Sequence, residues 1–487
     1  MAKKKETKIP LKVVIDREKK KVVFAEASST LVDIVFSFLT LPMGTIVRLL
    51  AKHSHQSHVP ANIEAFSNLY GSVAKLNSKH FKKERCKDML LNAWNSAEQE
   101  CRNLKIKIDD TEPIKYFICE GECFEKNIYR DMPAYITTDS TVKCKTCGEL
   151  LKEEVDRNAG TSQGDEGVFV TETSSFIISD DLHVIPNNPT STLKILDSSE
   201  IENFAALEED TLKLGADEFI HLLQLSFSSE TPLSDLFFGT KTMNSQVPSM
   251  ESPIATRGDD SSKKMNIKIY VQKSTNRIFL AHCSEDFIDF LLSLLTIPLG
   301  KVIRLLNNNH QSIFCFENVH KSVLELNVDE YLRSQKVKEK LLNPKLSEYY
   351  LGSSHIFPLE GNPICNKYLS DLDSDIFKEL TDASPKLEGF VRGPTKYMVT
   401  DDLFVSPFSS VSCFTHLQSL KVPISDIEEQ VISIGMEEAL KLLRASLTST
   451  SVLSNGLKLF ILKNAKQETS VNLPKYDRTL KKPKVDK

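Results

Sequence analysis

The amino-acid sequence repeats itself over most of its length. When the chain is shifted by 256 residues, residues 31–50 align with residues 287–306, and nine of the twenty positions are identical. Most of the other positions exchange one apolar residue for another. This distance is far longer than the period of a short-repeat solenoid, so the pattern predicts two divergent copies of one domain.

The similarity extends on both sides of this block. Residues 22–25 correspond to 278–281, and the Asp-Asp-Leu run at 180–182 recurs at 401–403. Several residues of one segment also recur in order, namely Phe66/Phe316, Asn68/Asn318, Ser72/Ser322, Val73/Val323, Leu76/Leu326 and Asn77/Asn327. We therefore expect a disordered N-terminus at 1–7, the first copy at 8–238, a flexible Ser- and Pro-containing linker at 239–264, the second copy at 265–462 and a disordered tail at 463–487.

Length and charge narrow the classes of protein that remain. A chain of 487 residues is too long for one compact core, which agrees with two domains. The formal net charge of −5 gives no overall attraction to phosphate backbones or anionic lipid. No apolar signal segment follows the basic N-terminus, and Asp33, Pro42 and Arg48 interrupt the most apolar stretch. We expect a cytoplasmic protein without a membrane segment, with nuclear import through the basic residues 481–484 as an open alternative.

The coarse secondary structure indicates the α+β class, because helices and strands mix without regular alternation. A capping box of residues 28–30 with Asp33 should begin a helix that runs to about residue 40. Pro42 and Gly44 should break it before a second helix that ends near Lys52. The further expected elements are strands at 11–16, 21–27, 115–119, 134–137, 175–179 and 193–196, and a helix at 216–227.

Four cysteines form the clearest candidate site. Cys119 and Cys123 are followed after twenty residues by Cys144 and Cys147, and Gly148 suits the tight turn after the second pair. Two such pairs can supply four thiolates to one tetrahedral zinc ion, with a strand between them as in a zinc ribbon. The predicted module spans about 115–152 and holds one structural zinc per chain, because four protein ligands leave no open position. A redox Cys-x-x-Cys motif and four unrelated cysteines are the alternatives.

The second copy differs from the first in this region. It keeps only Cys365, with His355 ten residues earlier, so we expect no metal there. If the copies share a fold, the fold can lose the zinc module. The zinc module should then stabilise only its own local segment of the chain and not the core of the domain.

Other polar clusters have competing interpretations. His53, His55 and His58 could bind a metal, although a polar loop between helices is the favoured interpretation. Asp33 and Arg48 could form an ion pair between two helices, and Arg48 could instead bind an anion or be exposed.

Two further clusters have a simple structural explanation beside a functional one. The pairs 180–181 and 401–402 resemble catalytic carboxylates, but neighbouring residues in a strand point to opposite faces, so a turn is the simpler interpretation. The basic segment 79–87 is typical of a solvated helix face and could alternatively contact nucleic acid.

These residues resemble a plant family known only as domain of unknown function 674. The resemblance rests on residues 39–50 and 295–306, on the four-cysteine cluster, on the Asp-Asp-Leu runs and on the pattern that ends each copy near 214–233 and 434–453. The missing cysteines of the second copy and Val452 in place of a proline depart from the pattern. The resemblance implies a plant protein but no activity that could be carried over.

Three functional hypotheses follow. No phosphate-binding glycine loop, zinc-protease motif or nucleophile elbow is present, so a non-enzymatic binding or scaffold protein with an unidentified protein partner is favoured. An enzyme with a site between the copies is the first alternative. A zinc-ribbon nucleic-acid binder is the second, and it predicts that Lys143, Lys145 and Lys152 join the lysines of 79–87 in one basic face.

Overall fold

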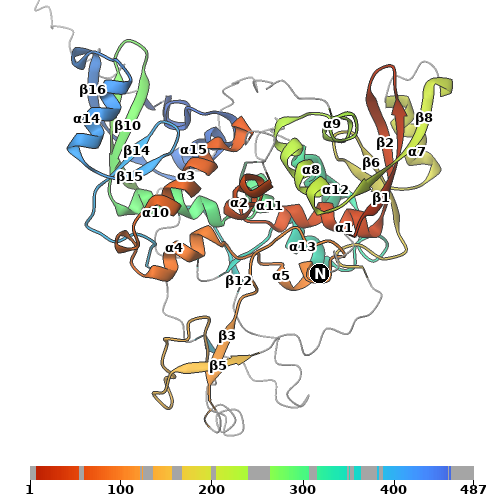
Figure 1. Cartoon of the computed structure of the whole chain (residues 1–487), viewed down its shortest axis with the longest axis horizontal. Helices are drawn as coiled ribbons and strands as arrows, with labels where there is room; N and C mark the ends of the chain where they lie inside the picture. Colours follow the sequence, from red (N-terminus) through yellow and green to blue (C-terminus); the bar gives the residue numbers. More distant parts are fainter. Residues whose placement is uncertain are drawn as a thin grey trace, which may run out of the picture.

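The computed structural model of the chain describes residues 7–53, 60–120, 123, 135–155, 167–198, 204–239, 264–306, 315–347, 350, 356–362, 381–382, 388–458 and 460–461. Two sheets lie at opposite ends of the molecule, and helices from both halves fill the space between them (Figure 1). The predicted linker, N-terminus and tail fall almost wholly outside the described residues, and the domain boundaries stay a prediction.

The first half contains these elements: β1 (Ile9–Asp16), β2 (Lys21–Ser28), α1 (Ser29–Ser37), η1 (Phe38–Thr40), α2 (Met43–His53), η2 (Ala61–Ile63), α3 (Glu64–Lys75), η3 (Ser78–His80), α4 (Glu84–Leu91), α5 (Glu98–Cys101), β3 (Tyr116–Cys119), β4 (Tyr135–Ile136), β5 (Leu151–Val155), β6 (Ser175–Ser179), β7 (Val184–Pro186), α7 (Pro189–Ser198), η4 (Phe204–Ala206), β8 (Leu207–Leu214), α8 (Ala216–Ser228) and α9 (Pro232–Phe238).

The second half contains these elements: β9 (Met265–Gln272), β10 (Arg277–Cys283), α10 (Glu285–Ser293), η5 (Leu294–Thr296), α11 (Leu299–Leu306), α12 (Phe316–Glu325), α13 (Gln335–Leu342), β11 (Leu346–Ser347), β12 (Gly361–Asn362), β13 (Thr381–Asp382), β14 (Tyr397–Thr400), β15 (Val405–Pro407), α14 (Ser410–Ser419), η7 (Ile424–Asp426), β16 (Ile427–Ile434) and α15 (Met436–Thr448).

The two five-stranded sheets have the same topology. Their strand orders are β7-β6-β2-β1-β8 and β15-β14-β10-β9-β16, and every neighbouring pair is antiparallel. Strands β1 and β9 also share one alternation of buried and exposed residues, which places every second side chain in the core. The α+β class is confirmed. The two sheets of equal topology correspond to the two copies of the sequence repeat.

Most predicted elements of the first half are present, with one clear error. Residues 193–196 lie in helix α7 and not in a strand. The helix begins because Pro189 occupies its first position and the Asn188 side chain accepts a hydrogen bond from the Ser191 amide, 2.9 Å away. A short apolar run carries too little periodicity to separate helix from strand, and these neighbouring residues decide between them.

The helix break at Pro42 is confirmed, but the reason given for Gly44 is wrong. Gly44 lies inside α2, and a Cβ atom there would stand 3.1 Å from the backbone oxygen of Leu295 in the other half. The equivalent Gly300 would place a Cβ atom 3.0 Å from the oxygen of Leu39. Both glycines therefore permit a close approach between the two halves.

The halves meet across a local two-fold relationship. Pro42 and Pro298 form an antiparallel bridge. Next to it, the Met43 amide donates to the oxygen of Ile297 at 3.0 Å, and the Leu299 amide donates to the oxygen of Leu41 at 2.9 Å. Leu41, Met43, Ile297 and Leu299 are buried, so this contact is apolar and continuous with the core.

Candidate metal centre

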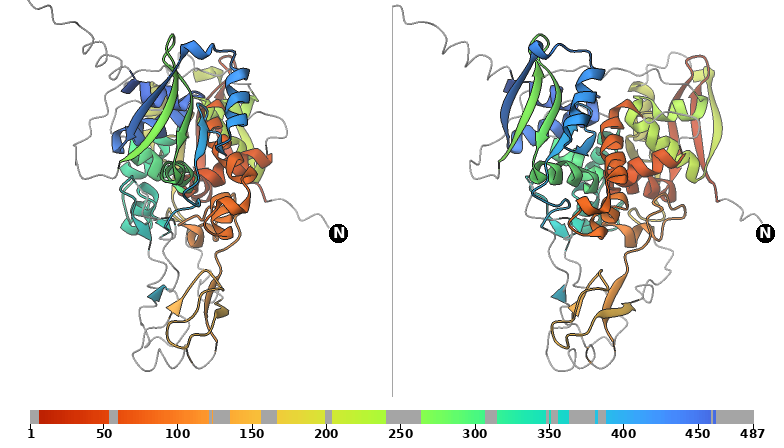
Figure 2. Two further views of the ribbon diagram at one scale, coloured as in Figure 1. Left: turned by 90° about the vertical axis from the view of Figure 1, so that its left-hand side faces the viewer. Right: turned by 60° about the vertical axis from the view of Figure 1, so that its left-hand side comes forward.

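The four cysteines lie on a small ribbon that projects from the helical body (Figures 1 and 2). Strands β3 and β5 are antiparallel, with Cys119 opposite Leu151. Thr137, which follows strand β4, pairs with Phe117 of β3 through two hydrogen bonds of 2.7 and 2.9 Å. The expected strand between the cysteine pairs is thus present, although it is only two residues long.

The second cysteine pair sits in a tight turn. The Gly148 amide donates to the oxygen of Cys144 at 2.9 Å, and the Cys144 amide donates to the oxygen of Glu149 at 2.7 Å. Gly148 has a φ of +76°, in the left-handed region that glycine occupies without strain. The predicted role of Gly148 in the turn is therefore confirmed.

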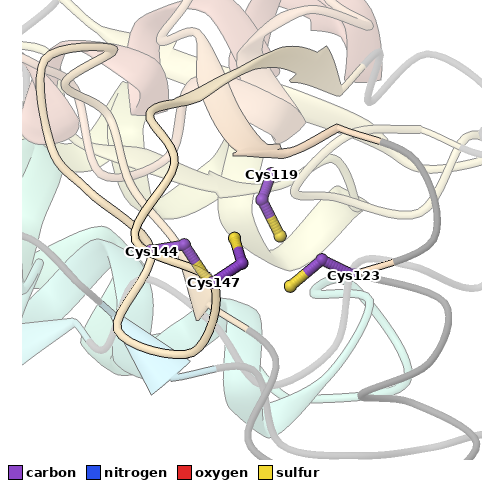
Figure 3. Close-up of side chains that lie close together, drawn as sticks. All are labelled: Cys119, Cys123, Cys144 and Cys147. Atoms are coloured by element: carbon purple, nitrogen blue, oxygen red, sulfur yellow. The ribbon is translucent and has the colours of Figure 1, made fainter.

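The four thiols converge on one point (Figure 3). The sulfur atoms of Cys119, Cys123, Cys144 and Cys147 all lie within 4.8 Å of one another. A tetrahedral metal–thiolate site with bonds of about 2.3 Å has edges of about 3.8 Å between sulfur atoms, so this spacing needs little adjustment to close around an ion. Cys119 and Cys144 are buried and Cys147 is exposed, which places the site at the ribbon surface. The cluster could bind a metal ion.

The electrostatics of the thiols are uneven. Burial raises the pKa of Cys119, and burial with the neighbouring thiols raises the pKa of Cys123 to about 11. Burial also opposes ionisation of Cys144, but the amides of Cys147 and Thr146 donate to its sulfur and together lower its pKa. A bound cation would favour all four thiolates, because a metal stabilises deprotonated ligands.

The ribbon is attached to both halves of the chain. Arg85 on α4 lies 2.5 Å from Asp139 in the ribbon, measured between Nη1 and Oδ2. Strand β13 of the second half pairs in parallel with β4, with the backbone of Thr381 opposite Tyr135. The segment of the second half that lacks the cysteines therefore contributes backbone to the ribbon of the first.

Comparison with protein families assigns the chain. Residues 5–437 match the family described as protein of unknown function, DUF674. The chain belongs to the DUF674 family. Comparison of this DUF674 chain with curated proteins and with solved structures gave no match. Within the described residues, no helix has the length and apolarity needed to cross a bilayer.

The remaining candidate sites of the DUF674 chain have structural roles or lie outside the described residues. Nδ1 of His53 is 3.0 Å from the carboxylate of Asp217, whereas His55 and His58 are not described. Cys365 and His355 of the second half are not described either.

The predicted ion pair between Asp33 and Arg48 is wrong. Nη2 of Arg48 lies 2.7 Å from the Asp110 carboxylate, and its Nη1 donates to the side chain of Asn92. Asp33 is buried and accepts hydrogen bonds from the backbone instead, so it does not form the predicted capping box. Helical spacing brought the two residues onto neighbouring helices but could not show that each had a better partner elsewhere.

The Asp-Asp pairs are turn residues, as predicted. Asp180 accepts hydrogen bonds from the amide and hydroxyl of Ser234 at 2.8 and 2.6 Å. Asp181 accepts from the side chain of Asn318 at 3.0 Å. The two carboxylates thus bind different segments and do not face one substrate. Burial raises the pKa of Asp180 to about 6.

The basic segment 79–87 is used partly for internal contacts. Nζ of Lys87 donates to the oxygens of Ala74 and Leu76 at the end of α3, and Lys338 makes the same contacts in the second half. These lysines cap helix ends, where cations are favourable. The recurrence of this lysine in the repeat was a signal for that role.

Proposed function

We propose that this protein is a non-enzymatic intracellular binding or scaffold protein of plants, whose first copy holds one structural zinc ion. The convergence of Cys119, Cys123, Cys144 and Cys147 within 4.8 Å carries the proposal. Four thiolates complete a tetrahedral shell and leave no position for water or substrate. Zinc is the ion that best suits four soft ligands in a ribbon, and its role would be to hold the ribbon folded.

The position of the ribbon supports a binding role. It projects from the body (Figure 2), and residues of both halves hold it through Arg85 and through β13. A small module with few buried residues needs a metal to be stable by itself. We expect the metal-loaded ribbon to present a fixed surface to a protein partner.

The two alternatives receive less support. At the described contact between the halves, Gly44 and Gly300 leave too little space for a Cβ atom, which argues against a substrate site at that point. The nucleic-acid alternative needs one basic face across ribbon and body. Lys143, Lys145 and Lys152 of the ribbon are exposed. In the segment 79–87, however, Arg85 is paired with Asp139 and Lys87 caps a helix. The ribbon strand β5 also carries two exposed acids, Glu153 and Glu154.

Zinc per chain tests the proposal. Elemental analysis of protein purified without added metal or chelator should give one zinc, and the Cys144→Ser, Cys147→Ser double variant should give none. Cys413→Ser, which changes a half-buried thiol of α14, is the matched control and should keep the zinc. A wild-type chain that lacks zinc and takes up none from solution would overturn the metal assignment.

A second measurement tests the binding role. Pull-downs with the zinc-loaded chain and with the double variant should differ in a reproducible protein partner that the Cys413→Ser control retains. Identical sets of bound proteins, or no reproducible partner at all, would count against a binding surface on the ribbon. A bound oligonucleotide at low salt would favour the nucleic-acid alternative.

A further inference from the structure

Each half of the chain donates a helix to the sheet of the other half. Helix α3 of the first half packs against β15 of the second, and α12 of the second packs against β7 of the first. Figure 1 shows both helices in the central layer between the sheets. The exchange is reciprocal. Each helix also packs against helices of its own half, α3 against α2 and α4, and α12 against α11 and α13.

The polar contacts of this exchange occur in matched pairs. Oγ of Ser72 on α3 accepts a hydrogen bond from the Val405 amide at 2.8 Å, and the Asn68 side chain donates to the oxygen of Asp402 at 2.9 Å. In the opposite direction, Oγ of Ser322 accepts from the Val184 amide at 2.7 Å, and Asn318 donates to the oxygen of Asp181 at 2.9 Å. Both serines are fully buried.

The segments that follow these helices repeat the exchange. The Lys82 amide donates to the oxygen of Phe390 at 2.9 Å, and the Arg392 amide donates to the oxygen of His80 at 2.8 Å. Their counterparts join the Arg333 amide to Phe169 at 3.1 Å and the Thr171 amide to Tyr331 at 2.9 Å. Each pair of segments therefore forms an isolated bridge between the halves, Phe81 with Val391 and Val170 with Leu332.

Separation of the halves would expose their buried contact surface to water. Leu41, Met43, Ile297 and Leu299 are buried at this contact, and exposing a buried aliphatic side chain costs about 1.5–3 kcal/mol. A separated half would lose this stabilisation. The halves are therefore interdependent, unlike domains that merely touch.

Each half carries both sides of the contact. The first half holds the helix residues Asn68 and Ser72. It also holds their partners, Asp181 in a turn and Val184 in β7. The second half holds the same two sets, at Asn318 and Ser322 and at Asp402 and Val405. A surface of this kind is self-complementary, as in a two-fold symmetric dimer.

We propose that the partner this surface fits is another copy of the same unit. The two halves are the subunits of an intertwined pair, held together by the exchanged helices and not by the covalent connection through residues 240–263. A half of one chain can therefore be replaced by the corresponding half of a second chain.

A cut in the connection tests the first part of the proposal. A site-specific protease sequence is placed within residues 240–263 of the full-length chain, which is cleaved after folding. Native mass spectrometry should then find both fragments in one particle with the mass of the uncut chain. Fragments that separate at micromolar concentration in native buffer would overturn the proposal.

An exchange experiment tests the second part. Cleaved chains labelled with ¹⁵N are mixed with unlabelled cleaved chains, in native buffer and after dilution from urea. Pairs that combine a labelled and an unlabelled fragment support the proposal, as do pairs of identical halves. Fragments that re-form no pair while the uncut chain refolds under the same conditions would contradict it.

A point variant tests whether the contacts of α3 hold the cleaved halves together. Asn68→Asp places a carboxylate against the oxygen and carboxylate of Asp402, where Asn68 now donates. It should raise the Kd of the cleaved halves about tenfold or more.

Asn266→Asp, at an exposed position of β9, is the control and should leave the Kd unchanged. Equal Kd values for both variants would show that α3 does not hold the halves together. Because none of these residues lies in the ribbon, the outcome is independent of the zinc proposal.

Discussion

Oδ1 of Asp33 accepts a hydrogen bond of 2.7 Å from the backbone amide of Phe169, which lies 136 residues later in the chain. The amides of Val168 and Val170 donate to the same carboxylate at 2.8 and 2.9 Å. The second half repeats the arrangement, since Asp289 accepts from the amides of Phe390 and Val391. In both halves the segment that the aspartate binds, around Phe169 or Phe390, also forms backbone hydrogen bonds with the opposite half. The buried aspartate therefore fixes the segment that makes these contacts.

Removal of this carboxylate should weaken the fold. In Asp289→Ala the buried amides of Phe390 and Val391 lose their acceptor, and we expect the free energy of unfolding to fall by about 2–4 kcal/mol. Urea unfolding followed by circular dichroism measures the change. Asp197→Ala, at an exposed position of α7, is the control and should change it by less than about 0.5 kcal/mol. Equal effects of the two substitutions would show that the loop does not need Asp289.

The buried carboxylates should also make stability depend on pH. Burial raises the pKa of Asp180 and of Asp289 to about 6. The folded chain then binds these protons more tightly than the unfolded chain, so their contribution to the free energy of unfolding falls as the pH rises from about 4 to 6 and is constant above that.

The double variant Asp180→Asn, Asp289→Asn isolates this contribution. Its free energy of unfolding, minus that of the wild type, should increase by a few kcal/mol, in order of magnitude, between about pH 4 and 6 and then level off. Urea titrations across this range give the slope, which does not depend on any constant cost of the substitutions. Gly71→Ala, which removes no ionisable group, is the control and should give a flat difference. A flat difference for the double variant would mean that both groups ionise as in the unfolded chain.

Local patterns in the sequence were sufficient for much of the fold and for the candidate site. The strand at 175–179 and the helix near 216–227 follow from residues within each segment. The cysteine cluster was predictable for the same reason, because the two cysteines of each pair are close in sequence. Strand β8 was missed because its sequence is largely charged, as an edge strand allows, and gives no apolar alternation.

The exchange between the halves could not be predicted in this way. The recurrence of Asp33, Ser72 and Gly44 indicated that these positions matter in each copy. It could not show whether Ser72 contacts its own half or the other, because both halves offer the same partner. Only the tertiary structure distinguishes two separate domains from an intertwined pair.

The close approach of the halves makes one glycine hard to replace. A Cβ atom at Gly300 would stand 2.8 Å from the oxygen of Leu341 and 3.0 Å from that of Leu39. Because both neighbours are backbone atoms, Gly300→Ala should destabilise the chain by about 1–3 kcal/mol. Gly71→Ala, in α3 with no atom within 4 Å, should instead stabilise it by about 0.5–1 kcal/mol. Thermal or urea unfolding of the two variants measures both values, and a stabilised Gly300→Ala would contradict the packing between the halves.

The turn at Gly148 should set the affinity of the ribbon for its metal. With φ at +76°, an alanine there is strained by about 1–2 kcal/mol, whereas asparagine tolerates this conformation better. Since the ribbon must adopt this turn for Cys144 and Cys147 to face one ion, Gly148→Ala should weaken zinc binding roughly 5- to 30-fold, and Gly148→Asn by less. Competition with a chromogenic chelator measures the affinities.

Gly239→Ala is the control for general effects of a strained turn and should leave zinc affinity unchanged. Gly239 has a φ of +63° after α9 and lies far from the cysteines in sequence. Equal zinc affinities for alanine and glycine at position 148 would mean that the thiols do not require this turn to bind the ion.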